Sequence, residues 1–288
     1  MRIEILTIFP GFFAGIFEHG IVSRAITTGR VEIGVHDLRQ FTHDRHRTVD
    51  DRPFGGGEGM VLKPEPLAQA LASLGVGRRL ERKPGEQVIL LSAQGRPFTQ
   101  VVARELAGVS SDPSQGTPLD RILFICGRYE GVDERINQLY CDRELSIGDY
   151  VLSGGELAAA VIADAVIRLL PGVLGNEASS AFESFGVADA SITTDEAGIP
   201  RSQHGAGGLL DYPHYTRPAE FAGVEAPAVL LNGDHLQIRR WRHEEQLRKT
   251  LANRPDLLER AILTAKDRQI LDRLRIEMSA KMPPDPQT

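Results

Sequence analysis

The sequence of 288 residues lacks most features that mark secreted, membrane or zinc-binding proteins. It has only two cysteines, Cys126 and Cys141, and neither lies in a C-x-x-C or Cys/His spacing typical of zinc sites. The longest apolar run is interrupted by Asp164 and Arg168, short of the roughly 18 residues that a membrane-spanning helix needs. The N-terminal stretch carries Glu4 and predicts a strand rather than a signal peptide. We therefore expect a soluble cytoplasmic protein with reduced, buried thiols.

An excess of positive charge and the usual phosphate-binding motifs are also absent. The net charge is −6, so RNA binding would depend on local clusters of arginine. The chain has no G-x-G-x-x-G with a suitably placed acid after its first strand, which argues against a Rossmann-type NAD enzyme. The glycine-rich loop 146–156, "SIGDYVLSGGE", has no Lys-Ser/Thr end that would bind phosphates. The composition, 41% hydrophobic and 25% charged, is that of an ordinary globular protein.

Strand-like and helix-like stretches alternate through the first part of the chain. We expect strands at 2–9, 31–38, 87–93, 121–127 and 143–148, and helices near 11–29, 64–75, 97–108, 131–139 and 156–170. This alternation predicts an α/β fold with a mostly parallel sheet. Ligands of such sheets bind beyond the carboxyl ends of the strands, where "SAQGRP", "CGRYEG" and "SIGDYVLSGG" are expected to form loops.

A segment rich in Ser, Ala and Gly then separates two regions of the chain. Hydrophobic periodicity is lost there, which predicts a mobile linker at 179–210 between a first domain, 1–178, and a C-terminal domain, 211–288.

Helical periodicity resumes from Asn232. Asp234 can cap one helix, Pro255 can open a second, and "TAKD" (264–267) resembles a capping box before a third.

The segment 43–60 combines three arginines, Arg45, Arg47 and Arg52, with histidines, aspartates and four glycines. So many charges predict an exposed loop. A glycine-hinged flap whose arginines bind phosphates is the favoured interpretation, and a merely solvated loop is the alternative. A metal site is disfavoured because the arginines would repel a cation.

A second basic segment, 237–249, interleaves Arg239, Arg240 and Arg242 with Trp241 on a predicted helix. This pattern suits binding to an RNA backbone. The alternative is a solvated helix face with the tryptophan in the core.

Three further motifs could carry chemistry. In "CGRYEG", Tyr129 offers a flat face and Glu130 a carboxylate for a ribose hydroxyl, although a plain strand-to-helix turn explains the pattern equally well. In 146–156, backbone groups and apolar side chains suit a flat base, unless Gly154 and Gly155 only permit close strand–helix packing. In "GLLDYPHYTRP", Asp211 lies in partly apolar surroundings, which suit a general base; a turn-forming or helix-capping role is the alternative.

Taken together, the motifs carry a family resemblance. "FTHDRHRTVDDRPFGGGEGM", "LSAQGR", "CGRYEGVDER", "SIGDYVLSGGE", "PGVLGNEAS", "LLDYPHYTRP" and "VLLNGDHLQIRRWR" resemble, in this order, the bacterial tRNA (guanine-37-N1)-methyltransferases of the TrmD type. The resemblance spans roughly residues 1–260, apart from a linker about twenty residues longer than usual.

This resemblance implies a trefoil-knotted SPOUT methyltransferase domain, a helical C-terminal domain and a homodimer whose subunits share the active site. It also implies S-adenosylmethionine as methyl donor, and as substrate the guanosine at position 37 of tRNA, preceded by another guanosine. A magnesium requirement stays open, and no metal ligands are assigned.

The resemblance also implies roles for particular residues. Asp211 is expected to be the general base. The methyl-donor pocket is expected to comprise Leu90, Leu91, Gly127, Tyr129, Glu130, Ile147, Gly148, Asp149, Tyr150, Val151, Leu152, Gly154 and Gly155. The expected tRNA-binding residues are Arg45, Arg47, Arg52, Arg217, Arg239, Arg240 and Arg242.

Departures from the family pattern leave room for a second hypothesis. Leu90 and Ala93 stand where the family usually has an aromatic residue and a proline, and we expect altered pocket rigidity there rather than lost activity. The long linker directly precedes Asp211. A binding module that holds RNA and a nucleotide without catalysis is therefore the competing class.

Overall fold

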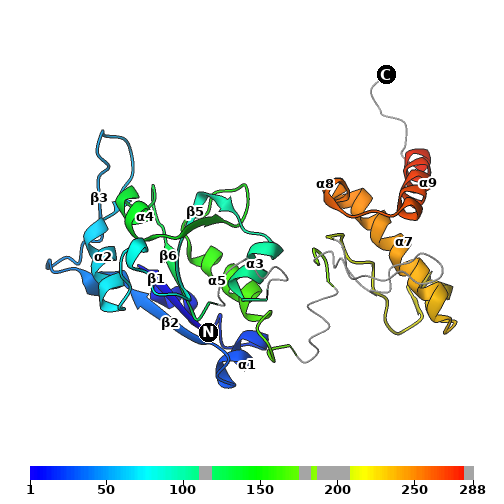
Figure 1. Cartoon of the computed structure of the whole chain (residues 1–288), viewed down its shortest axis with the longest axis horizontal. Coiled ribbons are helices and arrows are strands. Elements are labelled where there is room, and N and C mark those ends of the chain that lie inside the picture. Colours follow the sequence, from blue (N-terminus) through cyan, green and yellow to red (C-terminus); the bar gives the residue numbers. More distant parts are fainter. Residues whose placement is uncertain (110–118, 175–182, 187–207, 282–288) are drawn as a thin grey trace. The chain divides into compact units, whose positions relative to one another are not determined.

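The computed structural model describes residues 1–109, 119–174, 183–186 and 208–281. The chain forms two compact units, Met1–Gly175 and Asn176–Thr288, and each is described by itself (Figure 1). Most of the predicted linker lies outside the described residues.

The first unit is built on a sheet of five parallel strands in the order β2-β1-β6-β5-β7. The strands are β1 (Arg2–Thr7), β2 (Glu32–Asp37), β5 (Glu86–Pro97), β6 (Arg121–Cys126) and β7 (Arg143–Ser146). A separate antiparallel ribbon is formed by β3 (Asp50–Asp51) and β4 (Val61–Leu62). The prediction of an α/β fold with a parallel sheet is confirmed.

Helices cover both faces of this sheet (Figure 1). They are α1 (Gly20–Thr27), α2 (Pro64–Ser73), α3 (Gln100–Leu106), α4 (Glu134–Tyr140) and α5 (Glu156–Ile167), with short 3-10 helices at Pro10–Phe13, Leu38–Phe41 and Arg79–Glu81. Residues of α1, α3 and α5 share one hydrophobic core with the sheet, and residues of α2 and α4 share the other.

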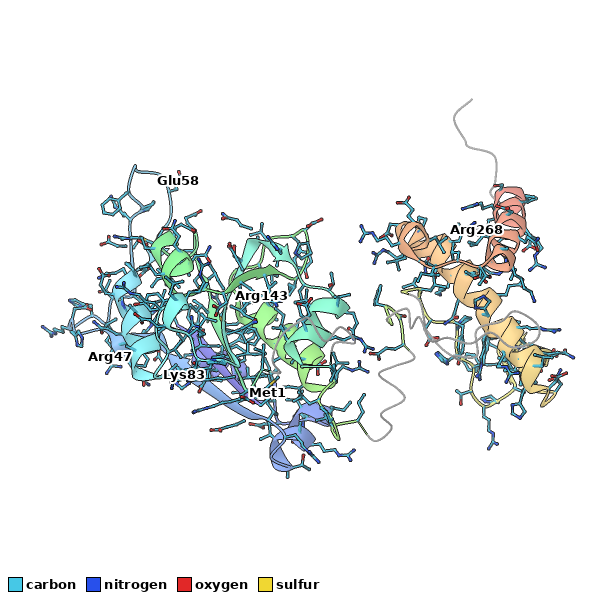
Figure 2. All side chains as sticks on the ribbon, viewed as in Figure 1. Met1, Arg47, Glu58, Lys83, Arg143 and Arg268 are labelled. Carbon is cyan, nitrogen blue, oxygen red and sulfur yellow. The ribbon has the colours of Figure 1, made fainter. Side chains whose placement is uncertain are left out.

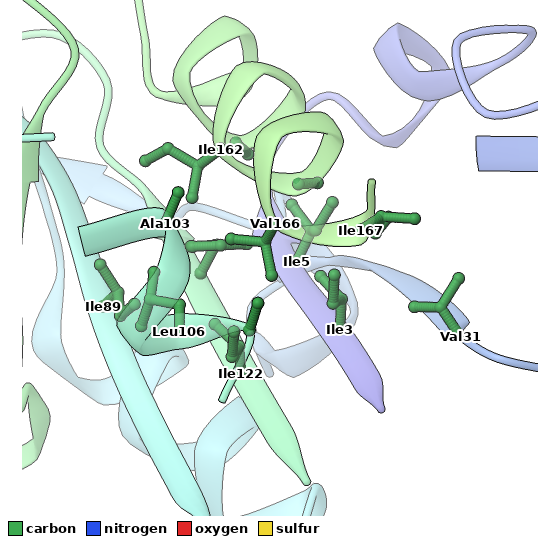
Figure 3. Packing of buried hydrophobic residues seen from close by; sticks show 14 of the residues in the cluster. Ile3, Ile5, Val31, Ile89, Ala103, Leu106, Ile122, Ile162, Val166 and Ile167 are labelled. Atoms are coloured by element: carbon green, nitrogen blue, oxygen red, sulfur yellow. The ribbon is translucent and has the colours of Figure 1, made fainter. Parts of the chain in front are cut away.

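Alternation along the strands creates the two cores. Ile3 and Ile5 of β1 are fully buried on the face covered by α5, where Ile162 and Val166 pack over them (Figure 3). Leu6, the next residue along β1, belongs to the core on the opposite face. Successive strand residues point to opposite faces, so a sheet buried on both sides needs apolar residues at nearly every position.

Glu4 of β1 departs most from this rule, because it is charged and completely buried. Its carboxylate forms ion pairs with Arg2 (2.7 Å) and Arg121 (3.2 Å) and contacts His36. Gly34 of β2 leaves room for this carboxylate, since a Cβ there would lie 2.3 Å from Glu4 Oε2. A buried charge needs such pairing, and the cluster ties β1 to β2 and β6.

Two element boundaries were predicted wrongly. The helix expected over 11–29 is interrupted, because Gly15 and Gly20 take positive φ angles of 83° and 65°, and α1 begins only at Gly20. The stretch 94–97, expected to be a loop after the predicted strand 87–93, is part of β5, although residues 92–95 bulge out of its pairing with β7. The next helix, α3, starts at Gln100 rather than at 97. Pairing with β7 extends β5 beyond its apolar segment, and no local pattern indicates that partner.

The second unit contains three helices and a short ribbon among its described residues. The helices are α7 (His235–Asn253), α8 (Pro255–Arg260) and α9 (Ala265–Lys281); β8 (Glu220–Phe221) pairs with β9 (Val224–Glu225), and a 3-10 helix spans Ala228–Leu230. Their core includes Leu247, Leu258, Leu271 and Leu274. Leu209 is buried in this core, so the C-terminal end of the predicted linker is packed structure.

The predicted helix starts of the second unit are confirmed. Asp234 accepts hydrogen bonds from the backbone N–H groups of Leu236 and Gln237, and Pro255 is the first residue of α8. Thr264 and Asp267 form a reciprocal capping box, in which each side chain accepts from the other residue's backbone N–H. No described helix combines the length and apolarity needed to span a membrane.

Asp267 makes the stability of the second unit depend on pH. Burial favours its neutral form, but hydrogen bonds from His243 (2.6 Å) and Thr264 outweigh this effect and lower the pKa of Asp267. A carboxyl whose folded pKa is depressed stabilises the fold above its unfolded pKa of about 3.9, and this contribution is lost as the pH falls through the folded value.

We expect Asp267→Asn to lower the free energy of unfolding of the full chain by about 1–3 kcal/mol at pH 7, because hydrogen bonds to a charged group are lost. The difference from the wild type should shrink toward pH 3. Urea denaturation across this pH range measures both effects. Asp272→Asn, at an exposed position of the same helix, is the control. If Asp267→Asn lowered the free energy of unfolding by the same amount at pH 7 and at pH 3, the stabilising role of the Asp267 carboxylate would be contradicted.

Candidate functional site

A cavity of about 270 Å³ opens at the carboxyl ends of β5, β6 and β7, which are neighbours in the sheet. Its floor includes Leu90 and Leu91 from β5. Its walls are the segments 127–132 and 146–155, which follow β6 and β7. This is where ligands bind in parallel α/β sheets.

The structure brings nearly all the predicted pocket residues together around this cavity. It is lined by Leu90, Leu91, Gly127, Tyr129, Glu130, Ile147, Gly148, Tyr150, Val151, Leu152, Gly154 and Gly155. Asp149, in the same loop, is exposed and does not line it. Lining residues that were not singled out from the sequence include Arg128, Glu134, Glu144 and Ser153.

A bulge in β5 shapes one side of the cavity. Leu91 and Arg96 both pair with Leu145 of β7, so residues 92–95 loop out of the ladder, and three of them line the cavity. Gly95 is required here, because a Cβ would lie 2.5 Å from the backbone N of Leu145. The bulge thus presents backbone groups to the cavity while β5 continues beyond it.

Gly154 and Gly155 allow the chain to pass close to the end of β6. A Cβ on Gly155 would lie 2.8 Å from the Cα of Cys126, and the Gly155 N–H donates to the Gly127 carbonyl at 2.9 Å. A Cβ on Gly154 would lie 2.1 Å from Nε of Arg128. The close-packing interpretation of these glycines is therefore confirmed, and the same geometry leaves backbone facing the cavity.

A buried ion pair holds the same loop. The guanidinium of Arg128 donates to both carboxylate oxygens of Glu156, at 3.0 and 3.2 Å, and to the Ser153 carbonyl at 3.0 Å. The hydroxyl of Thr7 also donates to Glu156, at 2.7 Å, and the guanidinium lies 4.5 Å from the centre of the Phe9 ring. Glu156 is only 1% exposed, so this set of contacts satisfies a fully desolvated carboxylate.

The rim opposite this loop carries Tyr129 and Glu130. Tyr129 has a positive φ of 56° and a half-exposed ring. The Glu130 N–H donates to the Met60 carbonyl at 3.0 Å, and a Cβ on Gly59 would collide with the Glu130 side chain. The glycine-rich segment before β4 therefore packs against the rim of the cavity.

The arginines of that segment are exposed, as predicted. Arg45, Arg47 and Arg52 lie between the 3-10 helix at Leu38–Phe41 and β4. Arg47 and Glu58 lie on loops that project from the first unit (Figure 2). Their placement leaves the arginines accessible to an anionic partner.

Asp211 belongs to the second unit. Its Oδ1 accepts a hydrogen bond from the Tyr212 N–H at 2.8 Å, and its Oδ2 lies 3.0 Å from Nε2 of His214. The Asp211 N–H donates to the hydroxyl of Ser184 at 2.9 Å. The carboxylate is three-quarters buried in a fixed orientation, with lone pairs left for another donor.

The predicted basic residues of the second unit differ in exposure. Arg217 and Arg240 are exposed, whereas Arg239 and Arg242 are partly buried on α7. The Arg242 guanidinium lies 4.9 Å from the centre of the Tyr212 ring. Burial raises the pKa of Tyr212 despite the charge of Arg242, and the nearby Asp211 adds to the shift, so the phenol stays neutral.

Within the described residues, no group of three or more His, Cys, Asp and Glu side chains could hold a metal ion.

The first unit is thus an α/β ligand-binding domain with its cavity at the carboxyl edge of a parallel sheet. The family model described as "tRNA (Guanine-1)-methyltransferase TrmD" matches residues 1–260. The chain is 54% identical over 275 residues to a tRNA (guanine-N(1)-)-methyltransferase of Koribacter versatilis, with 96% of this chain and 98% of the relative covered. Proteins of the same name from Syntrophotalea carbinolica (47%; 96% and 97% covered) and Geobacter sulfurreducens (46%; 96% and 99% covered) are also similar. The chain belongs to the tRNA (guanine-1)-methyltransferase family.

Both cysteines are buried, and we expect neither thiol to react in the folded protein. Burial raises the pKa of Cys126 well above its usual range, with Glu156 adding to the shift and Arg128 opposing it. Burial likewise raises the pKa of Cys141 to about 12. At pH 8 the thiolates are absent, so a disulfide reagent should label two thiols only after denaturation. Rapid labelling of the native protein would contradict this.

The Arg128–Glu156 pair should be sensitive to removal of one partner. We expect Arg128→Met to lower the free energy of unfolding by about 3–5 kcal/mol, because Glu156 stays buried without a cation. The double variant Arg128→Met/Glu156→Met should recover most of this loss. Chemical denaturation of the wild type, the single variants and the double variant measures the coupling, and Arg135→Met, at an exposed arginine of α4, is the control. A single variant as stable as the wild type would contradict the role of the pair.

Proposed function

We propose that this protein transfers the methyl group of S-adenosylmethionine to N1 of guanosine 37 in tRNA, where guanosine 36 precedes it. The observation that carries the proposal is the cavity at the ends of β5, β6 and β7, which gathers three separate motifs in a chain of this family. A cytoplasmic location follows from the same proposal, because tRNA and free buried cysteines belong to a reducing compartment.

The chemistry of the cavity suits the methyl donor. Its lining combines glycines and apolar side chains with the carboxylates of Glu130, Glu134 and Glu144, and it contains one arginine, Arg128, and no lysine. Backbone of 147–152 would bind adenine, and Glu130 would accept from the ribose. The proposed set is Leu90, Leu91, Gly127, Tyr129, Glu130, Ile147, Gly148, Tyr150, Val151, Leu152, Gly154 and Gly155; Asp149, expected from the resemblance, does not line the cavity. When bound, S-adenosylmethionine supplies an electrophilic methyl group on a positively charged sulfur.

Asp211 is the proposed general base. Guanine N1 carries a proton at neutral pH and is a weak nucleophile, so the N1–H bond must break as the bond from N1 to the methyl carbon forms; the bond from that carbon to sulfur would break in the same transfer and leave a neutral thioether, S-adenosylhomocysteine. The Asp211 carboxylate takes this proton, while Ser184 and Tyr212 hold its main chain and side chain in place. General-base assistance of this kind contributes roughly 10²–10⁴-fold, and positioning of the reactants contributes more.

The exposed arginines support tRNA binding by an acidic protein. Arg45, Arg47 and Arg52 in the first unit, and Arg217 and Arg240 in the second, are exposed and would neutralise phosphates locally although the chain has a net charge of −6. The partly buried Arg239 and Arg242 would contact the tRNA as well. Phosphate contacts of this kind position an RNA without reading its sequence.

Further parts of the proposal concern assembly. A trefoil-knotted SPOUT fold of the first unit is proposed from membership of the family. Leu157 and Val161 of α5 are half-exposed apolar residues, which would be covered in a homodimer whose subunits share the active site. The domain limits of 1–178, 179–210 and 211–288 and any use of Mg²⁺ stay predictions.

Asp211→Asn should lower the rate of methyl transfer by about 10²–10⁴-fold, because the amide cannot accept the N1 proton. The affinity for S-adenosylmethionine should stay unchanged, since the cavity lies in the other unit. Radiolabelled methyl transfer to unmodified tRNA and calorimetric titration of S-adenosylmethionine measure the two quantities, with Asp272→Asn as control.

The same assay tests the competing class of a binding module without catalysis. Methyl incorporation by the wild type only into tRNA with guanosine at positions 36 and 37 supports the enzyme. No incorporation by the wild type favours the binding module, and wild-type turnover by Asp211→Asn would remove Asp211 as the base.

A further inference from the structure

A second cavity, of about 160 Å³, lies entirely within the C-terminal unit. It is formed between the turn that follows Asp211 and one side of α7. Its lining includes Tyr212, His214, Tyr215, Ile238, Trp241 and Arg242, and we call it the aromatic pocket.

Two rings of the aromatic pocket remain accessible. Tyr215 is 50% exposed and lies edge-on to Trp241, with ring centres 6.1 Å apart and an interplanar angle of 61°. Trp241 is only partly buried on α7. A stable core would enclose such large apolar rings, and an open pocket bounded by them is suited to a flat ligand.

The pocket also contains an unused hydrogen-bond donor. Nε of Arg242 is buried and has no hydrogen-bond partner among the described residues. Nε itself is closed to water and so to a ligand, but Arg242 lines the pocket, and the other two nitrogens of its guanidinium can donate to a ligand that brings an acceptor. Because Arg242 lines the pocket, the ligand should be both flat and rich in acceptors.

A guanine base meets both requirements. Its π-face can stack on an aromatic side chain, which is worth about 1–3 kcal/mol per base. Its N7 and O6 are acceptors that an arginine recognises. A phosphate would satisfy Arg242 but would leave the aromatic rings without a partner.

The pocket is joined directly to the proposed general base. Tyr212 donates its backbone N–H to Oδ1 of Asp211, and Nε2 of His214 lies 3.0 Å from Oδ2. The residues that line the pocket on this side therefore belong to the same turn as the Asp211 carboxylate, although Asp211 itself does not line the pocket. In the proposed substrate, guanines at positions 36 and 37 could each be presented there.

We propose that the aromatic pocket binds an unstacked guanine base of the tRNA anticodon loop, with Tyr215 and Trp241 contacting its faces and edges and Arg242 donating to N7 or O6. This inference rests on the proposed function for its substrate. Taking a base out of the stack costs a few kcal/mol, which the contacts of the pocket offset.

The test uses the full-length protein and an anticodon stem-loop RNA with guanosines at positions 36 and 37. Trp241 is the only tryptophan of the chain, so its fluorescence reports occupancy of the pocket without requiring methyl transfer. We expect saturable quenching by this RNA, and roughly 5–150-fold weaker binding by Tyr215→Leu, as the loss of one stacking contact predicts. Tyr215→Phe, which keeps the ring, should recover most of the affinity.

Replacement of one guanosine by 7-deazaguanosine identifies the bound base, because this analogue lacks N7 but keeps N1. If guanosine 37 occupies the pocket, wild-type protein should bind more weakly to RNA with 7-deazaguanosine at position 37. If guanosine 36 occupies it, the modification at position 36 should weaken binding instead. Arg242→Lys should bind the normal RNA more weakly and lose this discrimination. Arg275→Lys, at an exposed arginine of α9, should retain it.

The outcomes separate this inference from the proposed function. Quenching with N7 discrimination but no methyl transfer would support the pocket and contradict the enzyme. Methyl transfer with an unquenched Trp241, and with affinity and discrimination unchanged in Tyr215→Leu and Arg242→Lys, would overturn the pocket.

Discussion

The ion pair between Arg128 and Glu156 is the contact on which the ligand cavity depends. One guanidinium reaches the start of α5, the carbonyl of Ser153 and the ring of Phe9, while Thr7 completes the shell around the carboxylate. Because Glu156 is almost completely desolvated, its charge would be costly without the guanidinium of the partly buried Arg128. Residue 154 in this loop is then a glycine, because the side chain of Arg128 occupies the space that a Cβ would need.

Strand order explains why three distant stretches of sequence meet around this pair. β5 lies between β6 and β7 although it precedes both in the chain. The three strands are parallel, so the segments that follow Leu91, Cys126 and Ser146 all begin at the same edge of the sheet. At the carboxyl ends of parallel strands, main-chain N–H and C=O groups are left without hydrogen bonds to a neighbouring strand. The bulge in β5 adds more of them, which is why the lining contains so much main chain.

Local features of this fold could be predicted from the sequence, and features created by distant partners could not. The caps at Asp234 and at Thr264–Asp267 depend on side chains within one helical turn, and both were predicted correctly. The extension of β5 depends on Leu145, nearly fifty residues further along, and no pattern in 92–97 reveals it. Glu156 was missed for a related reason, because a glutamate at a helix start normally faces water. The motifs located the cavity, but the contacts that hold it were found only in three dimensions.

The acidic character of the chain bears on how it would select a substrate. With a net charge of −6, a general electrostatic attraction to RNA is absent, so affinity must come from local contacts. Exposed arginines can contribute phosphate contacts but no choice of sequence, because every tRNA presents the same backbone. Arg242 differs from them, since its Nε is buried beside aromatic rings and next to the turn that holds Asp211. A base that accepts a hydrogen bond from the Arg242 guanidinium would be selected by a pocket whose turn also holds Asp211, so recognition and the proposed general base would share one segment of the chain.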